Sequence, residues 1–352
     1  MAPVECVRVV GAGLAGANDA FHLGNWAIRG GFTVSVYRRG PACASPGLVI
    51  GMTRSNLMSI GITQAAGPYE TIVVEPVTPL IGAEVTGVSL AEVDDRSFAE
   101  IHDAWIRHKV LFFRDQTDFS SVHMEELGRR FGEVDSPPKA LPTAAEAPYV
   151  AVIETNSGKK TYTDYWHTDL AYKRRPASVS ILRARVVPRT GGDTLWVNME
   201  AAYDELPQEV KDRVDSLRTY NSYEKSLRTY NDYARRDGRD LLSEEVIARR
   251  LTEHPPVEHP LVRTHPVTGN RSIYMSINAT THLVGLEQSE SDELLDFLYR
   301  LSDKPEHQVR LRWTPDTVAI WDNRSTRHYA ASDYFPERRV MERVMCVGEE
   351  VE

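Results

Sequence analysis

The chain has 352 residues, which suits one large domain or two of ordinary size, and either can bury a hydrophobic core. Hydrophobic residues make up 41% of the sequence and charged residues 26%, and no apolar run approaches the ~20 residues of a membrane-spanning helix. A formal net charge of -9, with basic residues scattered among acidic ones, argues against a nucleic-acid partner and favours a small-molecule one.

The cysteines indicate the redox environment. Cys6, Cys43 and Cys346 are far apart and form no C-x-x-C pair, so neither a disulfide framework nor a zinc knuckle is predicted. The N-terminus lacks the basic, apolar and small-residue pattern of a signal peptide, because Arg8 interrupts its apolar stretch. We therefore expect a cytoplasmic protein without a membrane span.

Residues 9–40 resemble the opening βαβ unit of flavin and nicotinamide enzymes, with an apolar strand, a Gly-x-Gly-x-x-Gly turn at 11–16, a helix and a second strand. Arg38 and Arg39 follow that strand where flavin enzymes carry a ribose-binding acid; arginines suit a 2'-phosphate instead. Only Gly-, Ser-, Pro- and Ala-rich, linker-like sequence follows, so the rest of a nucleotide-binding sheet is missing. We expect residues 1–70 to be an N-terminal extension without a working nucleotide domain; a flavin- or NADP-dependent oxidoreductase stays open as an alternative.

After this extension, helix and strand signals become dense. The segment "SFAEIHDAWIRHKV" has the apolar spacing of an amphipathic helix, "VLFFRDQ" follows as a buried strand, and "SVHMEELGRRFG" predicts a second helix ending at Gly132. Short strands dominate from there on. In "QVRLRW", for example, Val309 and Leu311 face one way and Arg310 the other. Many short strands with turn signals predict a mainly β fold, a jelly roll with flanking helices.

The region around residues 220–258 interrupts the strand pattern. It begins at a direct repeat, "SLRTYN" at residues 216–221 and 226–231, and then contains the charged, helix-like segment "LLSEEVIARRLTEHPP". Such insertions often cover active sites as lids, and a solvated helix with no role in chemistry is an equal alternative.

A candidate metal site lies in "DYWHTDLAY". If this segment is extended, His167 and Asp169 share one face with their Cα atoms roughly 7 Å apart. His328 directly follows a second strand pattern and supplies a third candidate ligand. Two histidines and one carboxylate form the facial triad of non-haem iron enzymes, which keeps coordination positions open for O2 and an organic ligand.

From about residue 72 to its end, the sequence resembles the taurine dioxygenase (TauD/TfdA-like) family of Fe(II)- and 2-oxoglutarate-dependent oxygenases. The matching segments agree in order and spacing: "VLFFRDQ", "RFGEV", "WHTDL", "GGDTLW", "AAYDELP", "HPLVRTHPVTG", "QVRLRW", "AIWDNRSTRHYAASDY" and "ERRVMERV". The resemblance implies a double-stranded β-helix in residues 71–352. It also implies that Fe(II), 2-oxoglutarate as cosubstrate and O2 serve to hydroxylate, cleave or desaturate a small organic substrate, with release of succinate and CO2.

The resemblance also assigns roles to residues. The iron ligands are His167, Asp169 and His328. Arg339, eleven residues after the last of them, binds the far carboxylate of 2-oxoglutarate with help from Thr194. A carboxylate buried beside a metal needs a permanent, forked cation, and arginine supplies one with two parallel hydrogen bonds.

Substrate contacts follow from the same resemblance. If "RRVMERV" is a strand, Arg343 shares a face with Arg339. Arg343 corresponds to the second arginine of the taurine enzyme, which binds the substrate's sulfonate. We therefore expect an anionic substrate. Other positions depart from the taurine enzyme. These positions are Pro137, Thr163, Leu227 and Ala279. We therefore expect the substrate to be larger than taurine and different from it.

Three further histidines, His254, His259 and His265, lie among prolines with no regularly spaced carboxylate, so structural roles are expected for them. We also expect a homo-oligomer, either a dimer or a tetramer. A non-catalytic β-barrel that holds a structural metal stays open as a second alternative function.

Overall fold

The computed structural model describes residues 26–28, 32–38, 48–54, 69–138, 141–158 and 163–351. The chain divides into two compact units, Met1–Gly61 and Ile62–Glu352, and each is described by itself. The division falls between residues 61 and 62, and the boundary expected near residue 70 stays a prediction.

The described part of the N-terminal unit is a small antiparallel sheet of β1 (Trp26–Ile28), β2 (Phe32–Arg38) and β3 (Leu48–Arg54). This differs from the expected βαβ-like unit, because β2 has antiparallel partners on both edges and no edge left for a parallel strand. In addition, β3 lies where linker sequence was expected. The glycine-rich turn at 11–16 lies outside the described residues.

The main unit is built on a larger sheet. Its strand order, among the described residues, is β4-β5-β6-β17-β9-β19-β8-β7, and all neighbours pair antiparallel except β5 and β6. The strands are β4 (Val73–Pro76), β5 (Ala83–Thr86), β6 (Val110–Phe113), β7 (Thr143–Ala144), β8 (Ala147–Thr155), β9 (Ala177–Val186), β17 (Val318–Asp322) and β19 (Arg339–Val347).

A smaller antiparallel sheet, in the order β16-β10-β18, packs against the larger one. Its strands are β10 (Thr194–Asn198), β16 (Gln308–Leu311) and β18 (Thr326–Ala330). The remaining short strands are β11 (Arg218–Asn221), β12 (Val257–Pro260), β13 (Val262–Thr264), β14 (Arg271–Ile273) and β15 (Thr280–Leu283).

Trp196 of β10 links the two sheets. Its ring centroid lies 5.5 Å from that of Phe112 on β6 and 5.6 Å from that of Trp321 on β17. On β16, Val309 and Leu311 are buried in the same cluster, and the intervening arginine is exposed, as the alternation predicted. Two sheets that enclose one apolar layer form the expected jelly roll.

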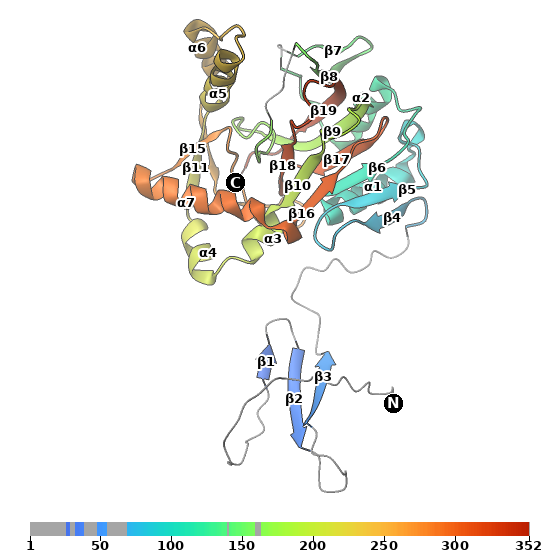
Figure 1. The fold of residues 1–352 in the computed structure, drawn as a ribbon, viewed down its shortest axis with the longest axis vertical. Helices are drawn as coiled ribbons and strands as arrows, with labels where there is room; N and C mark the ends of the chain where they lie inside the picture. Colours follow the sequence, from blue (N-terminus) through green and yellow to red (C-terminus); the bar gives the residue numbers. More distant parts are fainter. Residues whose placement is uncertain are drawn as a thin grey trace. The chain divides into compact units, whose positions relative to one another are not determined.

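The outer face of the larger sheet is covered by α1 (Asp95–His108) and α2 (Ser121–Phe131), as Figure 1 shows. The α1 helix begins where the Asp94 side chain accepts a hydrogen bond from the Ser97 backbone N–H. The α2 helix ends at Phe131 with Gly132 as its C-cap, within one residue of the predicted end. These helices leave the inner face free for the smaller sheet and the site.

The other helices lie beside the smaller sheet and the short strands (Figure 1). They are α3 (Met199–Asp204), α4 (Gln208–Val214), α5 (Tyr223–Arg236), α6 (Glu244–Glu253) and α7 (Gln288–Arg300). The helices α5 and α6 occupy the insertion expected around 220–258 and project away from the sheets (Figure 1). Among the described residues, no helix combines the length and apolar character that crossing a membrane requires.

Candidate metal centre

Three buried side chains meet beside the inner face of the larger sheet. Ligand atoms of His167, Asp169 and His328 all lie within 4.8 Å of one another. His328 lies on β18, and His167 forms an isolated antiparallel bridge with it: each backbone N–H donates to the other's carbonyl, at 2.9 and 2.7 Å. Backbone pairing thus brings together candidate ligands that are far apart in the sequence.

The two imidazoles are oriented for metal binding. His167 Nδ1 lies 2.9 Å from the Tyr165 carbonyl, which can only accept, so Nδ1 carries the proton and Nε2 keeps a free lone pair. His328 Nε2 lies 3.9 Å from Asp169 Oδ2. Burial lowers the pKa of His167, and it lowers the pKa of His328 well below its ordinary value. Both rings therefore favour the neutral form, which a metal ligand requires.

Asp169 stays ionised in spite of its burial. Burial alone would raise its pKa, but Arg343 and the two histidines oppose this, and so does the Ser180 hydroxyl. Together they lower the pKa of Asp169 to about 2. Arg343 Nη1 donates to Oδ1 at 3.3 Å, and Ser180 Oγ donates to Oδ2 at 2.7 Å. The donor set is thus one carboxylate and two neutral imidazoles, the combination that suits non-haem Fe(II).

Arg339, at the start of β19, has the environment expected of a carboxylate-binding residue. It is buried, and its Nε and Nη2 have no hydrogen-bond partner. The ring of Tyr334 lies close by, with its centroid 5.7 Å from the guanidinium carbon. Leaving such a cation unsatisfied is costly, and a carboxylate satisfies it with two parallel hydrogen bonds. The site therefore fits a 2-oxo diacid such as 2-oxoglutarate.

Thr194 is the first residue of β10. Its Oγ1 accepts a hydrogen bond from Trp313 Nε1 at 3.0 Å, which leaves the hydroxyl hydrogen free to be donated. Two residues earlier, Gly192 has φ +73°, and a Cβ there would lie 3.3 Å from Arg339 Cδ. Glycine thus lets the chain that leads into β10 pass close to the guanidinium.

The residues expected to contact the substrate differ in their position and in their exposure. Arg343 points into the site, on the same face of β19 as Arg339, as predicted from strand alternation. Thr163 is exposed, whereas Leu227 on α5 and Ala279 are buried. None of these three lines the cavity described next.

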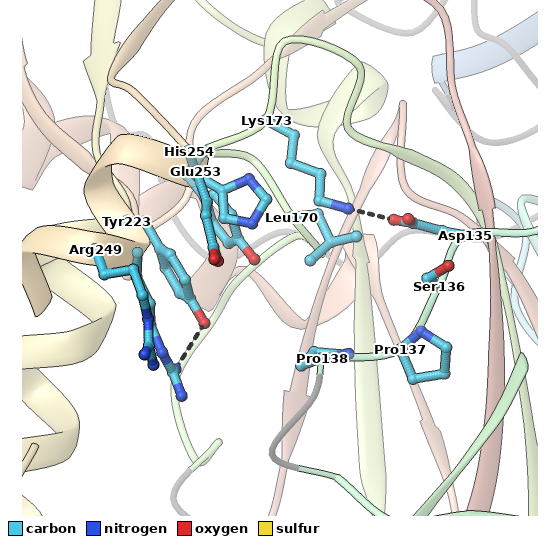
Figure 2. A pocket seen from close by; sticks show the side chains of 12 residues that line it. Asp135, Ser136, Pro137, Pro138, Leu170, Lys173, Tyr223, Arg249, Glu253 and His254 are labelled. Atoms are coloured by element: carbon cyan, nitrogen blue, oxygen red, sulfur yellow. Dashed lines mark hydrogen bonds and ion pairs between the residues drawn. The ribbon is translucent and has the colours of Figure 1, made fainter. Parts of the chain in front are cut away.

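A cavity of about 570 Å³ opens beside the metal motif. One wall is residues 135–138, and another follows directly on Asp169 and contains Leu170, Tyr172 and Lys173. The insertion supplies the third wall, with Tyr223 from α5 and Arg249, Arg250, Glu253 and His254 from α6 and its end. Figure 2 shows the side chains of these three segments around a common space.

Polar contacts hold the cavity walls in place. Lys173 Nζ pairs with Asp135 Oδ2 at 2.6 Å, an interaction visible in Figure 2. The Tyr172 and Tyr223 rings stack, with centroids 4.1 Å apart and an interplanar angle of 8°. Arg250 Nη1 donates to the Tyr223 hydroxyl at 3.4 Å. The insertion is therefore anchored to the chain just after the metal motif.

The remaining histidines hold the surrounding structure. His259 Nε2 lies 3.1 Å from the Ala171 carbonyl and 3.0 Å from the Lys173 carbonyl, and so fixes the segment after the metal motif. His265 Nε2 lies 2.9 Å from Asp322 Oδ2 at the end of β17. These contacts are the structural roles expected for His259 and His265, whereas His254 lines the cavity.

Ser180 and Asn323 are residues that sequence reasoning missed. Ser180 contacts Asp169, as described above, and Asn323 Nδ2 in turn donates to Ser180 Oγ at 2.8 Å. The available signal was a serine inside the predicted strand "SVSILRARVV".

Comparisons with known proteins agree with this geometry. The family model described as "Taurine catabolism dioxygenase TauD, TfdA family" matches residues 74–345. The chain is 34% identical over 283 residues to an alkylsulfatase from Acinetobacter baylyi, covering 80% of this chain and 87% of the relative. It is 34% identical over 285 residues to an alpha-ketoglutarate-dependent sulfate ester dioxygenase from Pseudomonas putida, covering 78% and 89%.

Solved structures show the same fold. A taurine dioxygenase from Burkholderia xenovorans superimposes with a TM-score of 0.66 at 32% identity, covering 80% of this chain and 90% of that one. The structure of AAD-2 in complex with Mn(II) and N-oxalylglycine gives a TM-score of 0.67 at 26% identity, covering 80% and 99%.

The family match spans most of the chain, and the relatives are covered nearly end to end. The reaction class follows: the protein is an oxidoreductase that uses Fe(II), 2-oxoglutarate and O2, and not a non-catalytic barrel. The chain belongs to the TauD/TfdA family of 2-oxoglutarate-dependent dioxygenases.

Proposed function

We propose that His167, Asp169 and His328 hold the Fe(II), and that Arg339 and Thr194 bind the far carboxylate of 2-oxoglutarate. The observation that carries this assignment is the pairing of a buried triad with a buried arginine that has two unsatisfied nitrogens. Bound iron and cosubstrate supply an oxidant strong enough for an unactivated C–H bond.

The chain's own residues bind, orient and exclude water. Arg339 neutralises the cosubstrate's outer carboxylate, and Thr194 donates its free hydroxyl hydrogen to the same group. Asp169 and the two histidines keep the charge states that metal binding requires. Trp321, which is 1% exposed, packs its ring 4.9 Å from that of His328 and keeps water from that side.

We propose an anionic substrate, and a sulfate ester in particular. Arg343 is the cation available to a sulfate group, because its Nε is buried without a hydrogen-bond partner. The 34%-identical relatives are named as an alkylsulfatase and a sulfate ester dioxygenase. Pro137, Thr163 and Ala279 stand where the taurine enzyme has other side chains, which argues against taurine.

Hydroxylation of a sulfate ester leads to release of sulfate. Hydroxylation at the carbon that carries the ester oxygen breaks one C–H bond and forms one C–O bond. The product, a hemiacetal ester, then loses sulfate and becomes an aldehyde. One oxygen atom of O2 enters that hydroxyl group and the other enters succinate, while CO2 leaves from the cosubstrate.

We place the body of the substrate in the cavity beside Leu170 and Tyr172, with α5 and α6 acting as its lid. The cavity of about 570 Å³ is within the usual range of small-molecule sites. Arg249 and Arg250 on α6 add positive charge at its outer wall, which draws anions towards it.

The test is a substrate screen that scores succinate and inorganic sulfate together. Medium-chain alkyl sulfates are compared with alkyl sulfonates of equal length, phenoxypropionate and taurine, with His167→Ala as the inactive control. We expect succinate and sulfate in equal amounts from the alkyl sulfates. Succinate at only the substrate-free rate with every alkyl sulfate contradicts the substrate assignment.

We also propose a cytoplasmic homo-oligomer. Cys346 carries a free, buried thiol, which suits a reducing compartment, and the apolar ring of Phe297 on α7 is 43% exposed. Light scattering measures the oligomeric state, and a monomer at micromolar concentration contradicts this part of the proposal.

A further inference from the structure

Asn323, in the turn after β17, touches the surroundings of two candidate ligands at once. Its Nδ2 donates to Ser180 Oγ at 2.8 Å, and Ser180 Oγ donates to Asp169 Oδ2 at 2.7 Å. Its Oδ1 accepts from Trp321 Nε1 at 3.1 Å and from the Asp169 backbone N–H at 3.3 Å. Asn323 is 1% exposed and Ser180 is 0% exposed, so water does not compete for these bonds.

The directions of these hydrogen bonds are fixed by chemistry. The Trp321 indole N–H and the Asp169 backbone N–H can only donate, so the Asn323 atom that faces them is the oxygen. The amide nitrogen must then face Ser180 and donate to it. Since Ser180 Oγ accepts this bond, its own hydrogen is directed to Asp169 Oδ2.

The Ser180 bond reaches the carboxylate oxygen on the side of the histidines. Asp169 Oδ2 is the oxygen that lies 3.9 Å from His328 Nε2, whereas Oδ1 faces Arg343. Each carboxylate oxygen thus has one fixed donor, and the group cannot rotate without breaking a buried, charge-assisted hydrogen bond.

The side-chain oxygen of Asn323 also acts on His328, through the packing of Trp321. The Trp321 ring lies with its centroid 4.9 Å from that of the His328 ring, at an interplanar angle of 56°. By accepting from Trp321 Nε1, Asn323 fixes the rotamer of the indole that supports His328. One amide therefore ties a ligand from the loop after residue 163 to a ligand on β18.

We infer that Asn323 and Ser180 are positioning residues of the metal centre, which hold Asp169 in a single orientation and thereby set the affinity for the metal. The inference rests on the proposed ligand set. Hydrogen-bond partners of metal ligands fix ligand orientation and basicity, and their loss typically weakens metal binding about 10- to 100-fold.

The experiment measures Mn(II) binding to metal-free protein in the presence of 2-oxoglutarate, by the electron paramagnetic resonance signal of free Mn(II). Ser180→Ala removes the donor to Asp169 with little change in volume, and we expect a Kd about 10- to 100-fold higher. Ser178→Ala is the matched control. Ser178 lies two residues earlier on β9, and its hydroxyl lies 3.4 Å from the carbonyls of Cys346 and Val347, so its contacts go to β19 and not to Asp169. This control is expected to bind like the wild type.

Asn323→Ala and the double variant test the chain of contacts. Asn323 acts on Asp169 partly through Ser180 and on His328 through Trp321. We therefore expect the double variant to bind Mn(II) more weakly than Ser180→Ala, but by less than the sum of the two single effects. Melting temperatures of the metal-free proteins separate a lost fold from lost affinity. Saturating Fe(II) is expected to restore most of the turnover of Ser180→Ala.

Ser180→Ala that binds Mn(II) as tightly as the wild type overturns the inference, whether or not its metal-free melting temperature falls. The proposed ligand set fails separately, through a His167→Ala variant that still binds Mn(II) like the wild type. The two results are read from different variants and so stay distinguishable.

Discussion

Arg343 Nη1 lies 3.3 Å from Asp169 Oδ1, so the cation proposed to bind the substrate's anionic group also pairs with the proposed metal-binding carboxylate. The arginine Nε is buried and has no partner, which leaves a donor for a second anion. One guanidinium thus contacts the candidate ligand carboxylate and still offers a donor to the substrate's anionic group.

Replacing this cation is expected to impair substrate binding more than cosubstrate binding. Arg343→Gln keeps a hydrogen-bond donor but removes the charge, and we expect kcat/KM for the anionic substrate to fall about 100-fold, or ~2.7 kcal/mol. The KM for 2-oxoglutarate is expected to change far less. Steady-state kinetics with each reactant varied in turn checks this, and an unchanged kcat/KM for the substrate rules out the role.

Arg339 is expected to control the cosubstrate. Arg339→Gln removes the forked cation from a buried site, and we expect the Kd of 2-oxoglutarate to rise at least about 100-fold, measured by anaerobic calorimetry. Arg338→Gln is the matched control, because Arg338 is the neighbouring arginine and pairs with Glu154 at the surface, at 2.8 Å. Equal losses in the two variants contradict a specific carboxylate site at Arg339.

His259 gives the stability a defined pH dependence. Burial lowers its pKa from 6.5 to about 4, against its hydrogen bonds to the Lys173 and Ala171 carbonyls. Because the folded pKa is the lower one, this stabilisation is complete above pH ~6.5 and is lost as the pH falls towards 4. Between pH 7 and 4.5, the wild-type unfolding free energy is expected to fall about 2 to 3 kcal/mol more than that of His259→Gln.

Urea unfolding at both pH values measures this difference. Parallel pH profiles for the two proteins contradict the prediction. They would mean that folding does not lower the pKa of His259 and that its hydrogen bonds do not stabilise the segment after the metal motif.

The α6 arginines are expected to speed the capture of anions. In the Arg249→Gln/Arg250→Gln double variant, we expect kcat/KM for the anionic substrate to fall roughly 10-fold at low salt, and its salt dependence to weaken. Arg235→Gln is the control, which removes a single surface charge. Arg235 pairs with Asp232 on the exposed side of α5. A kcat/KM that falls equally in this control assigns the effect to net charge and not to the cavity wall.

The sequence was enough to indicate the candidate triad, because a His-x-Asp spacing and a third histidine after a strand pattern are local signals. The expected extended segment was wrong in part: His167 forms a single β-bridge, and Asp169 begins a turn. The sequence also predicted the jelly roll. The contact between Ser180 and Asn323 was not predicted, because the two residues come together only when β9 pairs with β17 in the sheet.

Other expectations depended on position alone. Leu227 and Ala279 were expected to be substrate contacts from aligned positions, yet both are buried and lie outside the cavity lining, so that role stays a prediction. In the N-terminal unit, a local pattern of apolar residues around 32–38 correctly gave a strand, but no local signal fixes whether its neighbours run parallel or antiparallel.

The central claim is that the triad and Arg339 together bind Fe(II) and 2-oxoglutarate. The most direct measurement is an anaerobic absorption titration of the Fe(II)-loaded protein with 2-oxoglutarate. The account predicts a weak visible charge-transfer band that saturates at one equivalent in the wild type and is lost in His167→Ala and Asp169→Ala. A wild-type protein that shows no band and no binding of 2-oxoglutarate, or triad variants that keep the full band, would contradict it.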